Sequence, residues 1–197
     1  MYKHILIATD GSELAGKAVA AGFSLARLLE AKVTVVTVTE PWTALVSGDI
    51  GIAFPVDEYE KSSSENAAHI LASVSKLARK ADIECATVHA KDQYPAEGIL
   101  ETARTNNCDL IVMASHGRRG LGRLLLGSQA VKVLTHSTVP ALITGSVGRT
   151  AMYKHLLIAT DGSSASAKAI SDRIVLAKAV VTQTTVVMVT KPWGEAA

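Results

Sequence analysis

The chain has 197 residues, of which 48% are hydrophobic but only 4% aromatic, and its 20 basic and 18 acidic side chains give a net charge of +2. This length suits one full domain and a remainder, and a core of Ala, Val, Ile and Leu is typical of α/β proteins. Because the charges form no long single-sign run and no apolar run approaches the roughly 20 residues that span a bilayer, we expect neither nucleic acid nor a membrane as a partner.

The first predicted unit is strand, turn, helix and strand. Residues 4–9 form a short apolar run that ends at Asp10-Gly11-Ser12, after which apolar residues recur at helical spacing from Leu14 to Leu28. Ser12 is placed to cap this helix. Residues 32–39 are β-branched and nearly continuous, which favours a strand covered on both faces and therefore a parallel sheet.

Further helices and strands alternate along the chain after a long loop at residues 40–55. They are expected at residues 57–80 (helix), 84–89 (strand), 95–105 (helix), 110–114 (strand), 128–136 (helix) and 141–144 (strand). Right-handed crossovers turn this order into an open, doubly wound, Rossmann-like sheet of five parallel strands. In such a sheet ligands bind at the carboxyl ends of the strands.

The start of the sequence recurs near its end. MYKHILIATDGS at residue 1 returns as MYKHLLIATDGS at residue 152, and residues 1–42 align without a gap with 152–193, with 22 of 42 positions identical. The repeat has no counterpart of residues 43–144, which hold three of the five strands. We therefore expect a full domain at residues 1–145, a linker at 146–151 and, at 152–197, a truncated β-α-β repeat. Since the repeat cannot close a core alone, residues 152–193 should pack on a neighbouring domain or exchange with it.

The chemistry is expected in the loop ASHGRRGLGRLLLGS at residues 114–128, between the fourth strand and the fourth predicted helix. Small residues let the backbone approach a ligand, and a Gly-Ser step at a helix N-terminus offers free N–H groups to an anion such as phosphate. Arg118 is a candidate countercharge. The sequence lacks the P-loop pattern, and GxGxxG does not follow the first strand.

This loop resembles the nucleotide-binding motif of the universal stress protein family, GxxGxxxxxxxxxG followed by Ser or Thr, with Ala114, Gly117, Gly127 and Ser128 at the motif positions. Ala114 replaces the first glycine of the motif. The likeness extends over residues 1–145, from ILIATDGS to STVPALIT. It implies an adenine-nucleotide-binding α/β fold with strand order 3-2-1-4-5, usually a homodimer, acting in stress survival rather than metabolism.

The resemblance also implies the site. Ala8, Thr9 and Asp10 would lie beside the ribose and adenine, and the Val38 backbone against the adenine edge. The full set of expected nucleotide-binding residues is Ala8, Thr9, Asp10, Val38, Met113, Ala114, His116, Gly117, Arg118, Gly127, Ser128 and Gln129. No nucleophile is identifiably paired with His116 in the sequence, so no catalytic residue is assigned. The histidines lack HxxxH spacing, so Mg²⁺ is expected to arrive with ATP rather than in a protein cage.

The leading functional hypothesis is an ATP-binding, dimeric regulator of stress survival that is not a metabolic enzyme. Two alternatives stay open: an interaction protein of the same fold that does not bind nucleotide, and a slow ATPase. The fifth strand should end the sheet, so a homodimer through its edge is expected. The cytoplasm is the expected location, because Cys85 and Cys108 lie in no CxxC or zinc-binding spacing and the sequence shows no signal peptide.

Overall fold

The computed structural model describes residues 2–46, 55–117, 126–145, 155–164, 166–167, 170 and 183–188. The chain divides into two compact units, which we call the first unit (Tyr2–Arg149) and the second unit (Thr150–Ala197). Within the described ranges, no helix is both long and apolar enough to cross a membrane.

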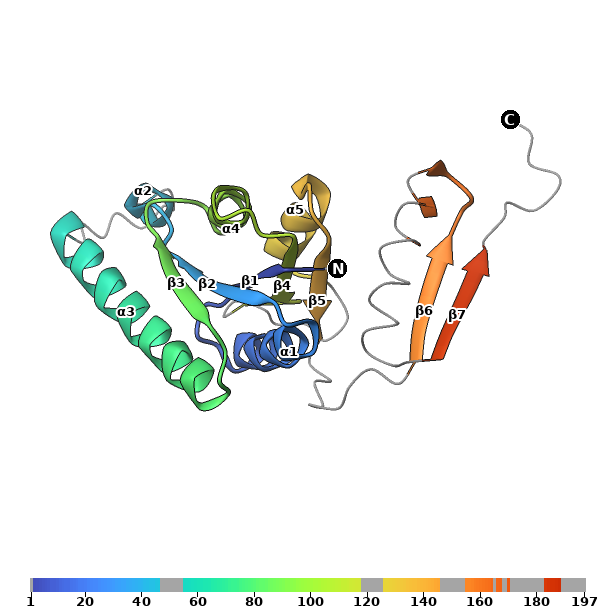
Figure 1. Ribbon diagram of the computed structural model, residues 1–197. Helices are drawn as coiled ribbons and strands as arrows, with labels where there is room; N and C mark the ends of the chain where they lie inside the picture. The colour runs from blue at the N-terminus through green and yellow to red at the C-terminus, as the bar shows by residue number, and fades with distance from the viewer. Residues whose placement is uncertain are drawn as a thin grey trace, which may run out of the picture. The chain divides into compact units, whose positions relative to one another are not determined.

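The first unit contains a five-stranded sheet in the order β3-β2-β1-β4-β5, in which every neighbouring pair is parallel (Figure 1). Its strands are β1 (His4–Ala8), β2 (Lys32–Val38), β3 (Cys85–Ala90), β4 (Leu110–Ala114) and β5 (Ala141–Thr144). The expected fold class and strand order are confirmed. The strand order reverses between β1 and β4, which places a ligand cleft at the carboxyl ends of these two strands.

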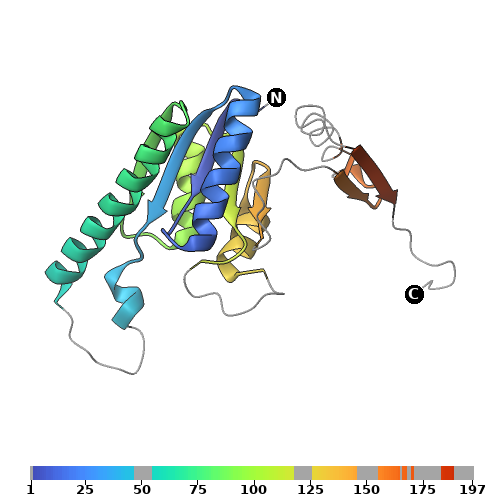
Figure 2. The same ribbon diagram turned by 90° about the horizontal axis from the view of Figure 1, so that it is seen from below.

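Helices cover both faces of this sheet. They are α1 (Glu13–Leu29), α2 (Trp42–Val46), α3 (Val56–Lys80), α4 (Pro95–Thr105) and α5 (Ser128–His136). α1 and α3 pack on one face, and α4 and α5 on the other (Figures 1 and 2). The short helix α2 lies in a segment that was expected to be loop, and residues 47–54 of that segment lie outside the described residues.

The centre of the sheet is fully buried, as its continuous apolar strands require. Ile5, Leu6 and Ile7 of β1 have no exposed surface. α1 lies unusually close to this strand at Gly22, where an added Cβ would be only 2.5 Å from Ile7 Cδ1. Glycine at this position therefore sets the distance between α1 and the sheet.

The second unit contains two parallel strands, β6 (His155–Thr160) and β7 (Gln183–Met188). They lie at the positions that the repeat predicts. Most of the segment between them lies outside the described residues, including the larger part of the expected helix. Packing of this unit on a neighbouring domain, or exchange with it, stays a prediction.

Candidate functional site

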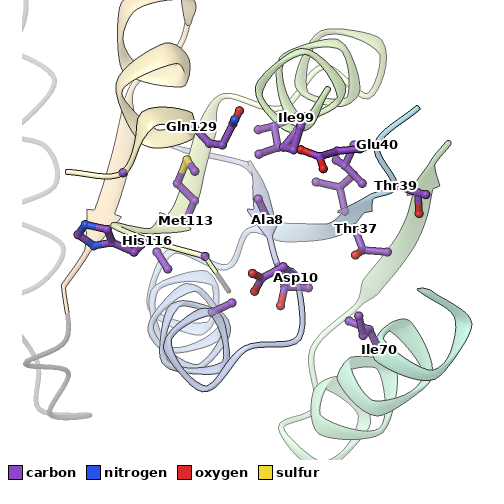
Figure 3. A pocket seen from close by; sticks show the side chains of 18 of the residues that line it. Ala8, Asp10, Thr37, Thr39, Glu40, Ile70, Ile99, Met113, His116 and Gln129 are labelled. Carbon is purple, nitrogen blue, oxygen red and sulfur yellow. The ribbon is translucent and has the colours of Figure 1, made fainter. Parts of the chain in front are cut away.

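A cleft of about 680 Å³ lies at the carboxyl ends of β1, β2 and β4 (Figure 3). This is the size range of small-molecule and cofactor sites, and the position is the reversal point of a doubly wound sheet. α3, α4 and the start of α5 supply the remaining walls. The cleft is therefore the candidate ligand site.

The end of β1 holds the carboxylate of Asp10 inside the cleft by a tight turn. The Ser12 N–H donates to Asp10 Oδ1 at 3.0 Å, and the Gly11 N–H donates to Thr9 Oγ1 at 3.2 Å. Gly11 has φ of 79°, a conformation that favours glycine. Gly117 approaches the same carboxylate so closely that a Cβ on it would lie 2.8 Å from Asp10 Oδ2. The motif glycine thus lies beside the residue expected to contact the ribose.

The end of β2 offers the cleft a backbone donor and acceptor at Val38. The Thr9 N–H donates to Val36 O at 2.9 Å, while the Thr39 N–H donates to Ala90 O at 2.9 Å on the opposite side of the strand. Backbone groups alternate sides along a strand, so those of Val38 face the β1 side. The β1–β2 pairing ends at Val36, before this residue. The N–H and C=O groups of Val38 can consequently donate to and accept from the edge of a flat ligand that lies in the plane of the sheet.

The two ends of the motif loop meet beside the start of α5. The Gly127 N–H donates to Ser115 O at 2.8 Å. A Cβ on Gly127 would also lie 2.8 Å from Ser115 O, although its φ of −63° suits any residue, so close approach is what requires glycine here. No side-chain cap closes the start of α5. Its first-turn N–H groups, from Ser128 onward, form an anion-binding end.

Ala114, which replaces the first motif glycine, fits the backbone without strain. It ends β4, pairs with Thr144 and is 7% exposed. The described non-glycine residues with positive φ are Glu30, Asp82, Asp92 and Asn107, and Ala114 is not among them. Its methyl group lines the cleft instead of distorting it.

The wall formed by α3 is a part of the site that the sequence did not predict. Tyr59, Ser63, Asn66 and Ile70 recur at helical spacing and line the cleft. The Tyr59 hydroxyl donates to Glu40 O at 2.7 Å and ties this end of α3 to the end of β2. The 25 residues of α3 make it about 37 Å long, whereas the 7 residues of β2 span about 23 Å. The amino-terminal part of α3 consequently extends beyond the strands (Figure 2).

All expected nucleotide-binding residues within the described part of the chain line this one cleft, and Arg118 lies outside the described residues. Those brought together are Ala8, Thr9, Asp10, Val38, Met113, Ala114, His116, Gly117, Gly127, Ser128 and Gln129. Besides the α3 wall, sequence reasoning missed Thr37, Thr39, Glu40 and Ser115, which lie in or just after the carboxyl ends of strands, and Pro95 and Ile99 of α4. The helical spacing of the α3 residues and the strand-end positions of the others are the signals that could have identified them.

The described lining is acidic. Asp10 and Glu40 lie in it, and the described residues contribute no lysine or arginine. His116 Nδ1 lies 3.2 Å from Ser115 Oγ, a pairing that the sequence did not reveal. Across the described ranges, no three His, Cys, Asp or Glu side chains gather as a metal site would need.

The family model of the universal stress proteins matches residues 1–145. Universal stress protein YxiE of Bacillus subtilis is 31% identical over 147 residues, which cover 73% of this chain and 99% of the relative. A solved universal stress protein from Archaeoglobus fulgidus superimposes with a TM-score of 0.75 at 22% identity, over 98% of this chain and 68% of that one. Another, solved in complex with cAMP, has a TM-score of 0.55 at 21% identity over 74% of this chain and 98% of its own. The chain therefore belongs to the universal stress protein family.

Proposed function

We propose that the first unit binds an adenine nucleotide, ATP with Mg²⁺, and that the protein acts as a dimeric regulator of stress survival rather than a metabolic enzyme. The observation that carries this proposal is the pairing, in one cleft, of the Val38 backbone edge with the uncapped start of α5. Adenine presents an acceptor at N1 beside a donor at N6, which complements an adjacent N–H and C=O. The cAMP complex of a family member supports an adenine nucleotide as the ligand class.

The remaining parts of the nucleotide find suitable surroundings between these two ends. Ile99 and Met113 give the base an apolar setting. The carboxylate of Asp10 can accept from ribose hydroxyl groups, and the N–H groups that open α5 can donate to phosphate oxygens. The neighbouring Gly117 leaves room for the sugar beside Asp10, because it carries no side chain.

The proposal includes Mg²⁺ because both the cleft lining and the triphosphate carry negative charge. The described lining contains the carboxylates of Asp10 and Glu40, and an accompanying cation would offset their repulsion of a triphosphate. Mg²⁺ favours carboxylate and phosphate oxygens, and commonly enters with its nucleotide and several waters. In this proposal, Asp10 accepts a hydrogen bond from a water of this hydrated ion. The metal then supplies countercharge to the phosphates.

The proposed dimer involves the β5 side of the sheet. Leu126, Val131 and Leu134, at and near α5, are 41%, 46% and 44% exposed, and β5 ends the strand order. An apolar surface beside an unpaired strand edge favours association with a second copy. Light scattering after size exclusion should give twice the chain mass at micromolar concentrations. A monomer mass throughout that range would refute the dimer.

Isothermal titration calorimetry tests nucleotide binding. We expect saturable binding of Mg²⁺-ATP, and a weakening of at least about tenfold in Gly117→Ala, because the new methyl group would lie against Asp10. Gly16→Ala is the matched control, since a Cβ there meets nothing within 4 Å. If folded dimer gives no heat at millimolar nucleotide, the protein is instead an interaction protein of this fold.

Slow ATP hydrolysis is a second candidate, favoured by the Ser115–His116 contact at the edge of the cleft. An imidazole held by a hydroxyl group can accept a proton from water. A steady-state phosphate-release assay should then show slow turnover that His116→Ala abolishes while ATP binding persists. Equal turnover in the wild type and His116→Ala would instead assign the signal to a contaminant.

A further inference from the structure

The first turn of α4 has a buried backbone donor that its own helix cannot satisfy. Ala96 is the second residue of α4 and is 3% exposed. Helices leave their first N–H groups without an intrahelical acceptor, and Tyr94 at the N-cap makes no side-chain capping bond. A buried N–H without a partner is costly. The start of α4 therefore needs an acceptor from another part of the fold.

Gln129 of α5 supplies that acceptor. The Ala96 N–H donates to Gln129 Oε1 at 3.2 Å, between residues 33 positions apart in the sequence. Figure 3 shows the Gln129 side chain extending from α5 towards α4, near Met113. Gln129 is the second residue of α5, so its side chain caps one helix from the first turn of another.

The two helices that Gln129 joins line different parts of the cleft. α4 contributes Pro95 and Ile99, which provide apolar surface, and α5 contributes the N–H groups that follow Gly127. A change in the spacing of these helices would move the apolar wall relative to the anion-binding turn. Loss of the Gln129 hydrogen bond should therefore affect ligand groups on both sides of the site.

We propose that Gln129 is a positioning residue that holds the start of α4 in place against the start of α5. This role goes beyond the nucleotide contact implied by the family resemblance, because the side-chain oxygen of Gln129 accepts from the Ala96 N–H of another helix. One test of this role measures ligand affinity and therefore rests on the proposed nucleotide-binding function. Its structural test at the Ala96 amide does not depend on any ligand.

A neutral amide suits this position better than a carboxylate. Glutamate has nearly the same length and also presents an acceptor to the Ala96 N–H. It would, however, place a negative charge in the first turn of α5, where an anionic ligand is expected to bind. Comparison of Gln129→Met with Gln129→Glu therefore separates the acceptor from the charge.

The first measurement is amide hydrogen exchange of Ala96, followed by NMR without nucleotide. Gln129→Met keeps the length of the side chain but removes the acceptor, and we expect Ala96 exchange to quicken by about fivefold or more. Gln129→Glu should restore the protection. Lys132→Met, at an exposed position of α5, is the control and should leave Ala96 unchanged. Equal Ala96 exchange in the wild type and Gln129→Met would overturn the proposal, whether or not the protein binds nucleotide.

The second measurement compares adenosine with Mg²⁺-ATP by calorimetry. A positioning role predicts that Gln129→Met weakens both ligands by a similar factor of about five. Gln129→Glu should recover adenosine affinity relative to Gln129→Met and still bind ATP poorly. If Gln129→Met weakens ATP alone, Gln129 contacts phosphate directly and the positioning role is wrong. If the wild type binds neither ligand, the proposed function fails and the Ala96 measurement decides the role of Gln129.

Discussion

The two units build the same strand pairing and the same turn from similar sequences, but among the described residues the candidate cleft is lined by the first unit. In each unit the two strands pair in parallel with the same sequence separation, His4 with Lys32 and His155 with Gln183. His155 Nε2 lies 2.8 Å from Thr185 Oγ1, and His4 Nε2 lies at the same distance from Thr34 Oγ1. The strand and turn geometry is therefore determined by nearby sequence.

The turn that follows β1 has the same geometry as the turn that follows β6. Gly162 has φ of 80°, close to the 79° of Gly11, and the Ser163 N–H donates to Asp161 Oδ1 at 2.9 Å. Hydrogen bonds from Ser163 lower the pKa of Asp161 to about 2, so this carboxylate is ionised at neutral pH. A geometry like that of Asp10 thus forms within residues 152–197, which contain no counterpart of the motif loop.

Burial separates the two units. All of β1 after His4 is buried, whereas Ile158 is the one residue of β6 that is buried and Leu157 is 63% exposed. β1 is flanked by β2 and β4, but β6 pairs with β7 alone among the described strands. A repeated strand–turn sequence therefore reproduces a turn, while the core and the candidate cleft of the first unit depend on strands and a loop that come later in that domain.

The repeat also differs at the position that brings α1 close to the sheet. Arg173 aligns with Gly22, where a Cβ alone would lie 2.5 Å from Ile7 Cδ1. Exchange of residues 152–193 for 1–42 would bring an arginine into this tight contact. Both arrangements expected for the repeat stay predictions, and this arginine counts against exchange.

Gly22→Arg should have the largest effect and tests this difference most severely. Inserting a charged side chain between α1 and β1 should destabilise the first unit by at least about 3 kcal/mol, and unfold it if its stability is of ordinary size. Urea unfolding followed by circular dichroism measures the change, with Gly16→Ala as the control. Unaltered stability would show that the helix tolerates the repeat's residue, and exchange would again be favoured.

Paired substitutions at Asp10 and Asp161 compare the two turns directly. Asp10→Ala should weaken Mg²⁺-ATP binding by about tenfold, because it removes an acceptor for the ribose and for metal-bound water. Asp161→Ala should leave the affinity within about twofold, because the second unit has no counterpart of the motif loop. Calorimetry on the full chain measures both. Equal losses in the two variants would place the repeat in the site.

Removal of Mg²⁺ should have a smaller, ligand-dependent effect. With EDTA present, ATP affinity should fall by about fivefold, since the phosphates then lose the countercharge of the metal in a cleft whose described lining is acidic. Adenosine carries no phosphate and should bind equally with and without the metal. Calorimetry in matched buffers makes the comparison, and identical ATP affinity in both buffers would contradict a role for the cation.

The smallest expected effect is a pH dependence confined to the first unit. Burial, followed by the charge of Lys91, lowers the pKa of His89, whose Nε2 lies 2.8 Å from Thr39 Oγ1. The folded protein therefore favours neutral His89, and this contribution to stability is present above pH 6.5 and lost as the pH falls through the folded pKa. The melting temperature should drop less between pH 7.5 and 5.5 in His89→Gln than in the wild type. An equal drop would contradict this assignment.

Local sequence patterns predicted the strands and helices, while the strand order and most of the candidate site residues were implied by the family resemblance. Apolar runs located the strands; Asp10 and Gly117 come shortly after strands whose carboxyl ends meet, and Gly127 directly precedes α5. The α3 wall was not predicted, because it depends on how far a helix extends past the strands. The contact of Gln129 with Ala96 was also out of reach, since it joins residues from two helices that only the folded chain brings together.

The stoichiometry of Mg²⁺-ATP binding to the full chain tests the central claim most directly. A nucleotide site that requires both the β1 turn and the motif loop predicts one ATP per chain in calorimetry, lost in Gly117→Ala but retained in Asp161→Ala. Two nucleotides per chain would contradict the claim that the second unit lacks a site. Folded protein that binds no nucleotide would contradict the proposed function itself.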